Sequence, residues 1–249
     1  SLFFPAHNRG QALPKRLVKL LKSPPGYWDL PELPELGSPL SQSGLIAKSQ
    51  RKFAHKFGAK GCFFGVNGAS GLIQSAVIAM ANPGETILMP RNVHISVIKI
   101  CAMQNINPIF FDLEYSRETG HYKPITKIWL SNVFEKLNFD ENKIVGVILV
   151  SPSYHGYAGD LEPLIDFCHQ KNLPVLVDEA HGSYFLFCEN LNLPKSALSL
   201  NADLVVQSLH KSLNGLTQTA VLWYKGNLVN EHNLIKSINL LQTTSPSSL

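Results

Sequence analysis

The chain has 249 residues, 45% of them hydrophobic and 16% charged, a composition typical of a folded protein rather than a disordered one. This length is sufficient for one large domain with a full core. The formal net charge of +4 is mild, and its densest basic patch (Lys15, Arg16, Lys19 and Lys22) is expected to be a solvated helix face, so nucleic acid is not predicted as a partner.

Residues 1–42 are rich in Pro and Gly, contain one helical segment at about Gln11–Lys22, and are interpreted as an N-terminal arm. Residues 43–249 alternate between apolar runs and helix-like segments and are interpreted as one large domain. Helices are predicted at Ile46–Phe57, Ser70–Met80, Ile95–Met103, Thr126–Leu137, Leu161–Gln170 and Glu231–Leu241. Strands are predicted at Gly61–Val66, Thr86–Met89, Pro108–Phe111, Ile144–Val150, Val175–Val177, Leu204–Gln207 and Ala220–Tyr224. The alternation predicts an α/β fold, a three-layer, mostly parallel sheet with helices on both faces.

The cysteines are scattered without paired spacing, so neither a disulfide framework nor a metal site is expected, and a reducing, cytoplasmic compartment is predicted (Cys62, Cys101, Cys168 and Cys188). No run approaches the roughly 20 apolar residues of a membrane span, so no membrane association is expected. Ser1–Pro5 lacks the charged and apolar regions of a signal peptide. The stretch Leu240–Leu249 is interpreted as a disordered tail or as the point where a longer ancestral protein has been cut.

The most informative strand end is that of Leu204–Gln207, which is followed by Ser208, Leu209, His210 and Lys211. Ligands of open α/β sheets bind at the carboxyl ends of the strands, so Lys211 is a candidate ligand-binding amine rather than an ordinary surface lysine. Partial burial near other cations would lower its pKa and produce the neutral amine that attacks an aldehyde. Ser208 and His210 on the same turn are candidate donors to a phosphate.

A second strand end of the same design places Asp178 after Val175–Val177. The sequence Asp-Glu-Ala-His there also resembles the Walker B box of a helicase, but the chain contains no Gly-x-x-x-x-Gly-Lys-Ser/Thr phosphate loop, which excludes that interpretation. Lys211 and Asp178 on one rim are what a pyridoxal phosphate (PLP) enzyme needs: an amine for the Schiff base and a carboxylate that keeps the pyridine nitrogen protonated. Ala180 lies on the same side of the extended chain as Asp178, where its methyl suits a flat ring.

Three further strand ends carry compact or polar residues. Gly65–Gly71, which includes Ala69, Ser70 and Gly71, opens a helix and predicts a phosphate cradle, although an ordinary cap looks the same. His94 follows the next strand and could stack on a cofactor ring, although a lone histidine is more often structural. Ser153 lies in the turn after Ile144–Val150. Together with Lys211 and Asp178, these strand ends favour a binding site over unrelated turns.

The order of these motifs resembles the Orn/Lys/Arg decarboxylases, the major-domain group of fold-type-I PLP enzymes. The resemblance runs over essentially the whole chain and rests on Pro5–Gly10, Asn67–Ser70, Arg91–His94, Ser151–Gly156, Asp178–His181 and Gln207–Lys211. It implies that Lys211 forms the Schiff base, that Asp178 pairs with the pyridinium and that His94 stacks on the ring. It also implies a phosphate site made by Ser70, Ser208 and His210, and cofactor contacts from Ala69, Gly71, Ser153, Ala180 and His181.

By that resemblance, the expected function is PLP-dependent decarboxylation of arginine, lysine or ornithine, in a homodimer. The chain departs from the family at Pro5-Ala6-His7, where Pro-Gly-His is usual, and family members continue well beyond the counterpart of residues 244–247. The expected domain content is therefore an arm and a PLP-binding large domain without the C-terminal domain. Two alternatives stay open: another fold-type-I reaction such as transamination, and a truncated, non-catalytic paralogue that binds PLP or pairs with a full-length partner.

Overall fold

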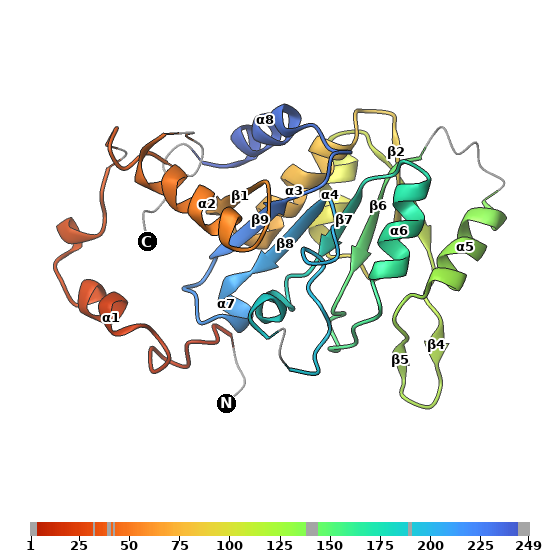
Figure 1. The fold of residues 1–249 in the computed structure, drawn as a ribbon, viewed down its shortest axis with the longest axis horizontal. Coiled ribbons are helices and arrows are strands. Elements are labelled where there is room, and N and C mark those ends of the chain that lie inside the picture. The colour runs from red at the N-terminus through yellow and green to blue at the C-terminus, as the bar shows by residue number, and fades with distance from the viewer. Residues whose placement is uncertain are drawn as a thin grey trace.

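The computed structural model describes residues 4–31, 33–38, 41, 43–137, 144–188 and 191–243. Within these ranges, the central element is a seven-stranded sheet of order β1-β9-β8-β7-β6-β2-β3 (Figure 1). Its strands are β1 (Gly61–Gly65), β2 (Thr86–Pro90), β3 (Asn107–Phe111), β6 (Ile144–Val150), β7 (Val175–Asp178), β8 (Leu204–Ser208) and β9 (Ala220–Tyr224). β9 pairs antiparallel with β1 and β8, and the other neighbouring pairs are parallel, so the predicted mostly parallel sheet is confirmed.

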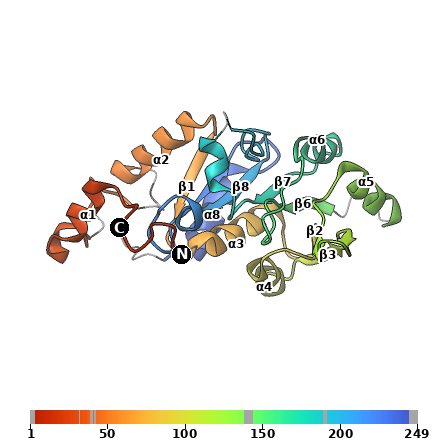
Figure 2. The same ribbon diagram turned by 90° about the horizontal axis from the view of Figure 1, so that it is seen from below.

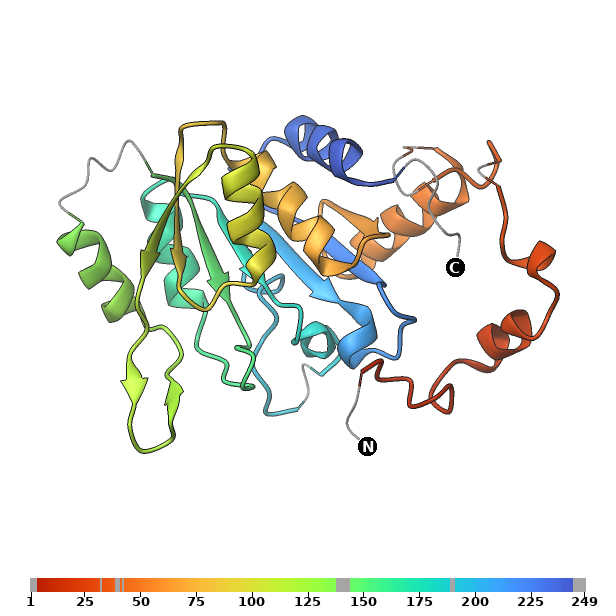
Figure 3. The same ribbon diagram turned by 180° about the vertical axis from the view of Figure 1, so that it is seen from behind.

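Helices cover both faces of this sheet, as the view along it shows (Figure 2). One face carries α2 (Gly44–Lys56), α5 (Lys127–Lys136) and α6 (Glu162–Gln170). The opposite face, which is turned to the viewer in Figure 3, carries α3 (Gly68–Met80), α4 (Ile95–Met103) and α8 (Glu231–Leu241). The predicted three-layer α/β fold is therefore confirmed.

The alternation of side chains along each strand divides the core between these two faces. In β8, Leu204 and Val206 pack with α3, α4 and α8, whereas Val205 packs on the other side with α2 and α6. β7 divides in the same way, with Leu176 on the first side. Because both faces are buried, these strands are apolar throughout, which is the pattern that identified them in the sequence.

Most predicted elements begin and end within two residues of their observed bounds. The largest difference is α1 (Lys15–Leu21), which was predicted to start at Gln11. Pro14 is the residue before this helix, and a proline disfavours helical geometry at the residue that precedes it, here Leu13. Among the described residues, the sequence prediction missed five short elements: η1 (Pro25–Tyr27), β4 (Tyr115–Ser116) and β5 (His121–Tyr122), which form a hairpin, η3 (Ser183–Phe187) and α7 (Leu209–Ser212).

The segment predicted to be an arm contains α1, none of whose residues is buried, and Figure 1 shows it at the periphery of the sheet. Its beginning lies close to α7, because the backbone N–H of Ala6 donates to the carbonyl of His210 at 2.9 Å. Residues 244–249 of the predicted tail lie outside the described residues. Of the helices in the described ranges, none has the length and apolar character that crossing a bilayer requires.

Candidate active site

A cavity of about 360 Å³ lies at the carboxyl ends of β2, β6, β7 and β8. Its wall includes seven of the side chains that the sequence singled out, which come from four separate segments: Ala69, Ser70, His94, Asp178, Ala180, His181 and Lys211. Parallel strands bring their carboxyl ends to one edge of a sheet, so residues far apart in the sequence meet there. The structure therefore brings together the predicted amine, the predicted carboxylate and the predicted stacking histidine.

Lys211 is carried by α7, the single turn of helix that follows β8 directly. Its Nζ lies 3.2 Å from Nε2 of His181. Burial lowers the pKa of Lys211, and the negative charge of Asp178 opposes this shift in part. A lysine with a lowered pKa has a larger fraction of neutral amine near neutral pH, which is the form that reacts with an aldehyde.

Asp178 ends β7 and is 7% exposed, and its Oδ1 accepts a hydrogen bond from the backbone N–H of Ala180 at 3.1 Å. Burial raises the pKa of this carboxyl, and the N–H of Ala180 and the charges of Lys211 and His94 oppose the shift. A buried carboxylate of this kind is stabilised by a cation or a charged N–H placed beside it. The cavity gives such a group access to Asp178.

His94 precedes α4 and caps it, because its Nδ1 accepts a hydrogen bond from the backbone N–H of Ser96 at 3.2 Å. The hydroxyl of Ser96 lies 2.8 Å from the same nitrogen. Because Nδ1 is an acceptor in the cap, the proton of the neutral imidazole lies on Nε2. The cap fixes the ring on the wall of the cavity.

The N-terminus of α3 forms another part of the wall through Ala69 and Ser70. The residue before this helix, Asn67, makes no side-chain capping hydrogen bond to the first backbone N–H groups. Uncapped N–H groups and the helix dipole together favour an anion such as a phosphate. Gly71 is buried in the first turn, where an added Cβ would lie 3.2 Å from Nε2 of Gln242.

Four predicted residues are not part of the cavity wall as described. Gly71 is covered by its neighbours, and Ser208 is fully buried with its hydroxyl 3.0 Å from Nδ1 of His210. That nitrogen of His210 also lies 3.3 Å from the carbonyl of Thr219. Ser153 lines a separate, small cavity, where its hydroxyl accepts from the backbone N–H of Tyr157 at 3.2 Å. The contacts predicted for these residues with a cofactor remain predictions.

Sequence reasoning gave no role to Glu179, which follows Asp178 in the chain and is fully buried. Its carboxylate accepts hydrogen bonds from the hydroxyl of Ser196 and the backbone N–H of Ala197, both at 2.7 Å, and from Nε2 of Gln207. The side chain of Gln207 is itself held by Nε1 of Trp223, which donates to Oε1 at 2.8 Å. Burial raises the pKa of Glu179 to about 7, against the opposing effect of its hydrogen bonds. This network joins the ends of β7 and β8.

Asn92 and Tyr154 also line the cavity and were not singled out. Oδ1 of Asn92 is buried without a hydrogen-bond partner in the described structure, and such an atom is suited to accept a hydrogen bond from a ligand. Tyr154 is 82% exposed beside the cavity. The signal that could have identified both is their position in the polar loops that follow strands β2 and β6.

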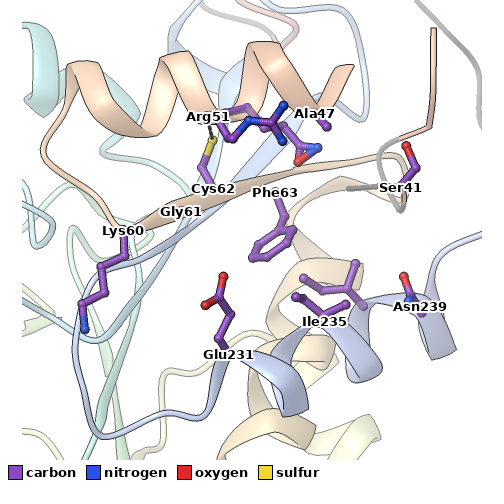
Figure 4. A pocket seen from close by; sticks show the side chains of 12 residues that line it. Ser41, Ala47, Arg51, Lys60, Gly61, Cys62, Phe63, Glu231, Ile235 and Asn239 are labelled. Carbon is purple, nitrogen blue, oxygen red and sulfur yellow. Dashed lines mark hydrogen bonds between the residues drawn. The ribbon is translucent and has the colours of Figure 1, made fainter. Parts of the chain in front are cut away.

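A second cavity, of about 290 Å³, lies between α2, β1 and α8 (Figure 4). Its wall carries Arg51, Lys60 and Glu231 around the apolar side chains of Phe63 and Ile235. It lies at the β1 edge of the sheet and contains none of the predicted site residues. The cavity that contains Lys211 is therefore the candidate active site.

The donor set of that cavity fits PLP. Lys211 is an amine with a lowered pKa for the aldehyde, Asp178 a buried carboxylate for the ring nitrogen, and the start of α3 an uncapped anion site. His94 and Ala180 are a flat and a small side chain on the same wall. Within the described residues, no group of three or more His, Cys, Asp or Glu side chains could hold a metal ion.

The fold is that of the fold-type-I enzymes, the class that includes PLP-dependent decarboxylases and aminotransferases. Residues 3–249 match the model of the family Orn/Lys/Arg decarboxylase, major domain, and the chain belongs to that family.

Arginine decarboxylases of Bacillus cereus and Bacillus subtilis are 34% and 33% identical to it, each over 98% of this chain. The chain spans about half the length of these relatives, 52% and 49% respectively. Lysine decarboxylase A from Pseudomonas aeruginosa has the same fold, with a TM-score of 0.78 and 22% identity over 99% of this chain and 36% of that chain.

Proposed function

We propose that this chain binds PLP and serves in the decarboxylation of a basic amino acid to the corresponding amine. The observation that carries the proposal is the meeting of Lys211, Asp178 and His94 at one cavity of a protein that belongs to a decarboxylase family. Bound PLP would supply a ring that takes up the electron pair left on Cα when the bond to the carboxylate breaks. The remaining chemistry belongs to residues of the chain.

Lys211 would hold the cofactor aldehyde through Nζ, and Nζ would be released as a free amine when the substrate amine takes its place at that carbon. Its lowered pKa supports that role, because the neutral amine is the nucleophile. Once released, Nζ would return a proton to the product. Asp178 would hold a proton on the ring nitrogen, and burial of this carboxylate strengthens the interaction with any cation beside it.

His94 and Ala180 would orient the ring from the wall of the cavity, and Ala69 and Ser70 would hold the phosphate at the start of α3. We propose additional cofactor contacts from Gly71, Ser153, His181, Ser208 and His210. Holding the ring in place sets the angle at which the substrate bond breaks, which is catalysis by positioning.

The substrate class that we propose comprises arginine, lysine and ornithine, with arginine first. Both Bacillus relatives named above are arginine decarboxylases and match the chain over almost its whole length. A lysine decarboxylase of Pseudomonas aeruginosa, by comparison, is 31% identical over 70% of this chain.

Binding of PLP to Lys211 has a direct test. The purified chain is incubated with PLP and reduced with borohydride, and the modified lysine is identified by peptide mass spectrometry. Lys211 should carry the cofactor in the wild type, and Lys211→Ala should remove it. Lys48→Ala, which changes an exposed lysine on α2, is the matched control and should leave the attachment unchanged.

Decarboxylation is tested by measuring the release of CO2 from arginine, lysine and ornithine by the purified full-length protein with PLP added. Release of CO2 from at least one of the three that depends on Lys211 would support the proposal. A wild type that takes up no PLP at Lys211 under excess cofactor would refute it.

A further inference from the structure

His181 lies between the lysine of the candidate site and two aromatic side chains. Its Nε2 is 3.2 Å from Nζ of Lys211, a hydrogen-bonding contact of this amine. The ring of Phe4 meets the imidazole edge-on with centroids 6.0 Å apart, and the ring of Tyr154 does so at 5.9 Å. These T-shaped contacts favour the observed orientation of the imidazole.

The segment that carries Phe4 is fastened to the turn that carries Lys211. The backbone N–H of Ala6 donates to the carbonyl of His210, the residue before Lys211, at 2.9 Å. Figure 3 shows this beginning of the chain beside α7. The arm, the imidazole and the lysine therefore form one connected unit at the cavity.

The charged and titratable groups around His181 come from four segments. Lys211 lies on α7, His94 before α4, Asp178 at the end of β7 and Tyr154 in the loop after β6. Burial, together with the positive charges of Lys211 and His94, lowers the pKa of His181 to about 4, so the imidazole is neutral near neutral pH. A neutral imidazole can hydrogen-bond to a neutral amine as donor or as acceptor.

We propose that His181 is a positioning residue for Lys211: its imidazole, held by Phe4 and Tyr154, keeps Nζ directed into the cavity and covers it from water. Covering the amine favours its neutral form, because desolvation penalises the ammonium. The inference deepens the proposed function by naming the group that prepares Lys211, but the state of the lysine can be measured without PLP.

The experiment follows acetylation of each lysine by acetic anhydride in the full chain without PLP, between about pH 6 and pH 10. Peptide mass spectrometry gives the midpoint of the titration for Lys211, with the exposed Lys48 as the internal reference. In the wild type, we expect the midpoint of Lys211 below that of Lys48. In His181→Ala, water reaches Nζ, and the midpoint should rise toward that of Lys48. Each unit of rise lowers acetylation of Lys211 at neutral pH about tenfold.

Two further variants define the role. His181→Gln fills similar space and places an amide near the position of Nε2, so it should keep most of the wild-type midpoint. Phe4→Ala removes one of the two aromatic side chains that contact His181. Because the side chain of Phe4 is 56% exposed, this change should raise the midpoint by less than His181→Ala. His232→Ala, which changes an exposed histidine on α8, is the matched control and should change nothing.

An unchanged midpoint in folded His181→Ala would overturn the proposal. If that variant does not fold, an unchanged midpoint in Phe4→Ala has the same meaning. Attachment of PLP is measured separately by borohydride reduction. Failure of the wild type to take up PLP would overturn the proposed function, whereas the acetylation midpoints would still decide the role of His181.

Discussion

Replacing Glu179 with Gln is expected to reduce the free energy of unfolding by about 1–3 kcal/mol, because it leaves a buried hydrogen-bond donor without an acceptor. In the wild type, one carboxylate oxygen accepts from Ala197 and the other from Ser196 and Gln207. A glutamine has only one acceptor oxygen on its side chain. If that oxygen faces Ala197, the new NH2 group of residue 179 faces the NH2 group of Gln207, so two donors meet. If the oxygen faces Gln207, the new NH2 group faces the N–H of Ala197, and again two donors meet.

Neighbouring side chains cannot remove this mismatch at low cost. The N–H of Ala197 belongs to the backbone. Gln207 cannot turn its amide around without losing the hydrogen bond from Trp223, which its Oε1 accepts at 2.8 Å. Only the hydroxyl of Ser196 can rotate. One buried donor is therefore left unsatisfied in either orientation, which gives the magnitude above.

The assay is urea unfolding at about pH 8, above the pKa of about 7 of Glu179, so that the carboxyl is ionised in the folded wild type. A loss of about 2 kcal/mol should lower the midpoint by about 1 M urea. The exchanged pair Glu179→Gln with Gln207→Glu restores a donor opposite an acceptor and keeps an acceptor for Trp223. Its destabilisation should be smaller than the sum of the two single changes by at least about 1 kcal/mol.

Two results would refute this reasoning. A midpoint of Glu179→Gln equal to that of the wild type would mean that the loss of one acceptor oxygen at residue 179 leaves no buried donor unsatisfied. Additive destabilisation in the exchanged pair would mean that residues 179 and 207 do not interact through this hydrogen bond.

Two further changes test other parts of the structure. Gly226→Ala would place a Cβ 1.6 Å from Oδ1 of the buried Asp203, so the segment after β9 must shift, and a loss of about 1–3 kcal/mol is expected in urea unfolding. Gly26→Ala, whose Cβ would meet no atom within 4 Å, is the control, and equal midpoints for both variants would contradict the structure. A thiol reagent should modify the half-buried Cys188 in the folded protein, whereas Cys62, Cys101 and Cys168 should react only after unfolding. Burial raises the pKa of these three thiols, to about 12 for Cys62 and Cys168. Modification of all four cysteines at a similar rate would show that the three are not buried.

The strands that are buried on both faces could be predicted from the sequence because burial leaves an apolar run with polar ends. Ile144–Val150 is such a run, and β6 has the predicted bounds. The direction of β9 could not be predicted, because its residues are equally compatible with a parallel or an antiparallel neighbour. The pairing depends on the path of the chain between β8 and β9. The hairpin of β4 and β5 was missed because a strand of two residues has no measurable alternation.

In the candidate site too, residues marked by a local sequence pattern could be predicted, whereas contacts between residues far apart in the sequence could not. Lys211 and Asp178 could be identified because each follows a strand directly, and the structure places both at one cavity. Ser153 also follows a strand, but the course of its loop turns it toward Tyr157 in another cavity. The network of Glu179 could not be predicted, since its partners lie 17 to 28 residues away along the chain and meet it only in the folded protein.

The attachment of Ala6 to the turn of Lys211 bears on how this protein is best handled in the laboratory. Because Phe4 lies against His181, which lines the cavity, any polypeptide joined ahead of the chain is attached only a few residues from the cavity wall. A purification tag or a fluorescent reporter in that position would place additional chain near the cavity. The exposed turn at residues 82–84, which precedes β2 and so lies at the opposite rim of the sheet, offers an insertion point remote from the cavity.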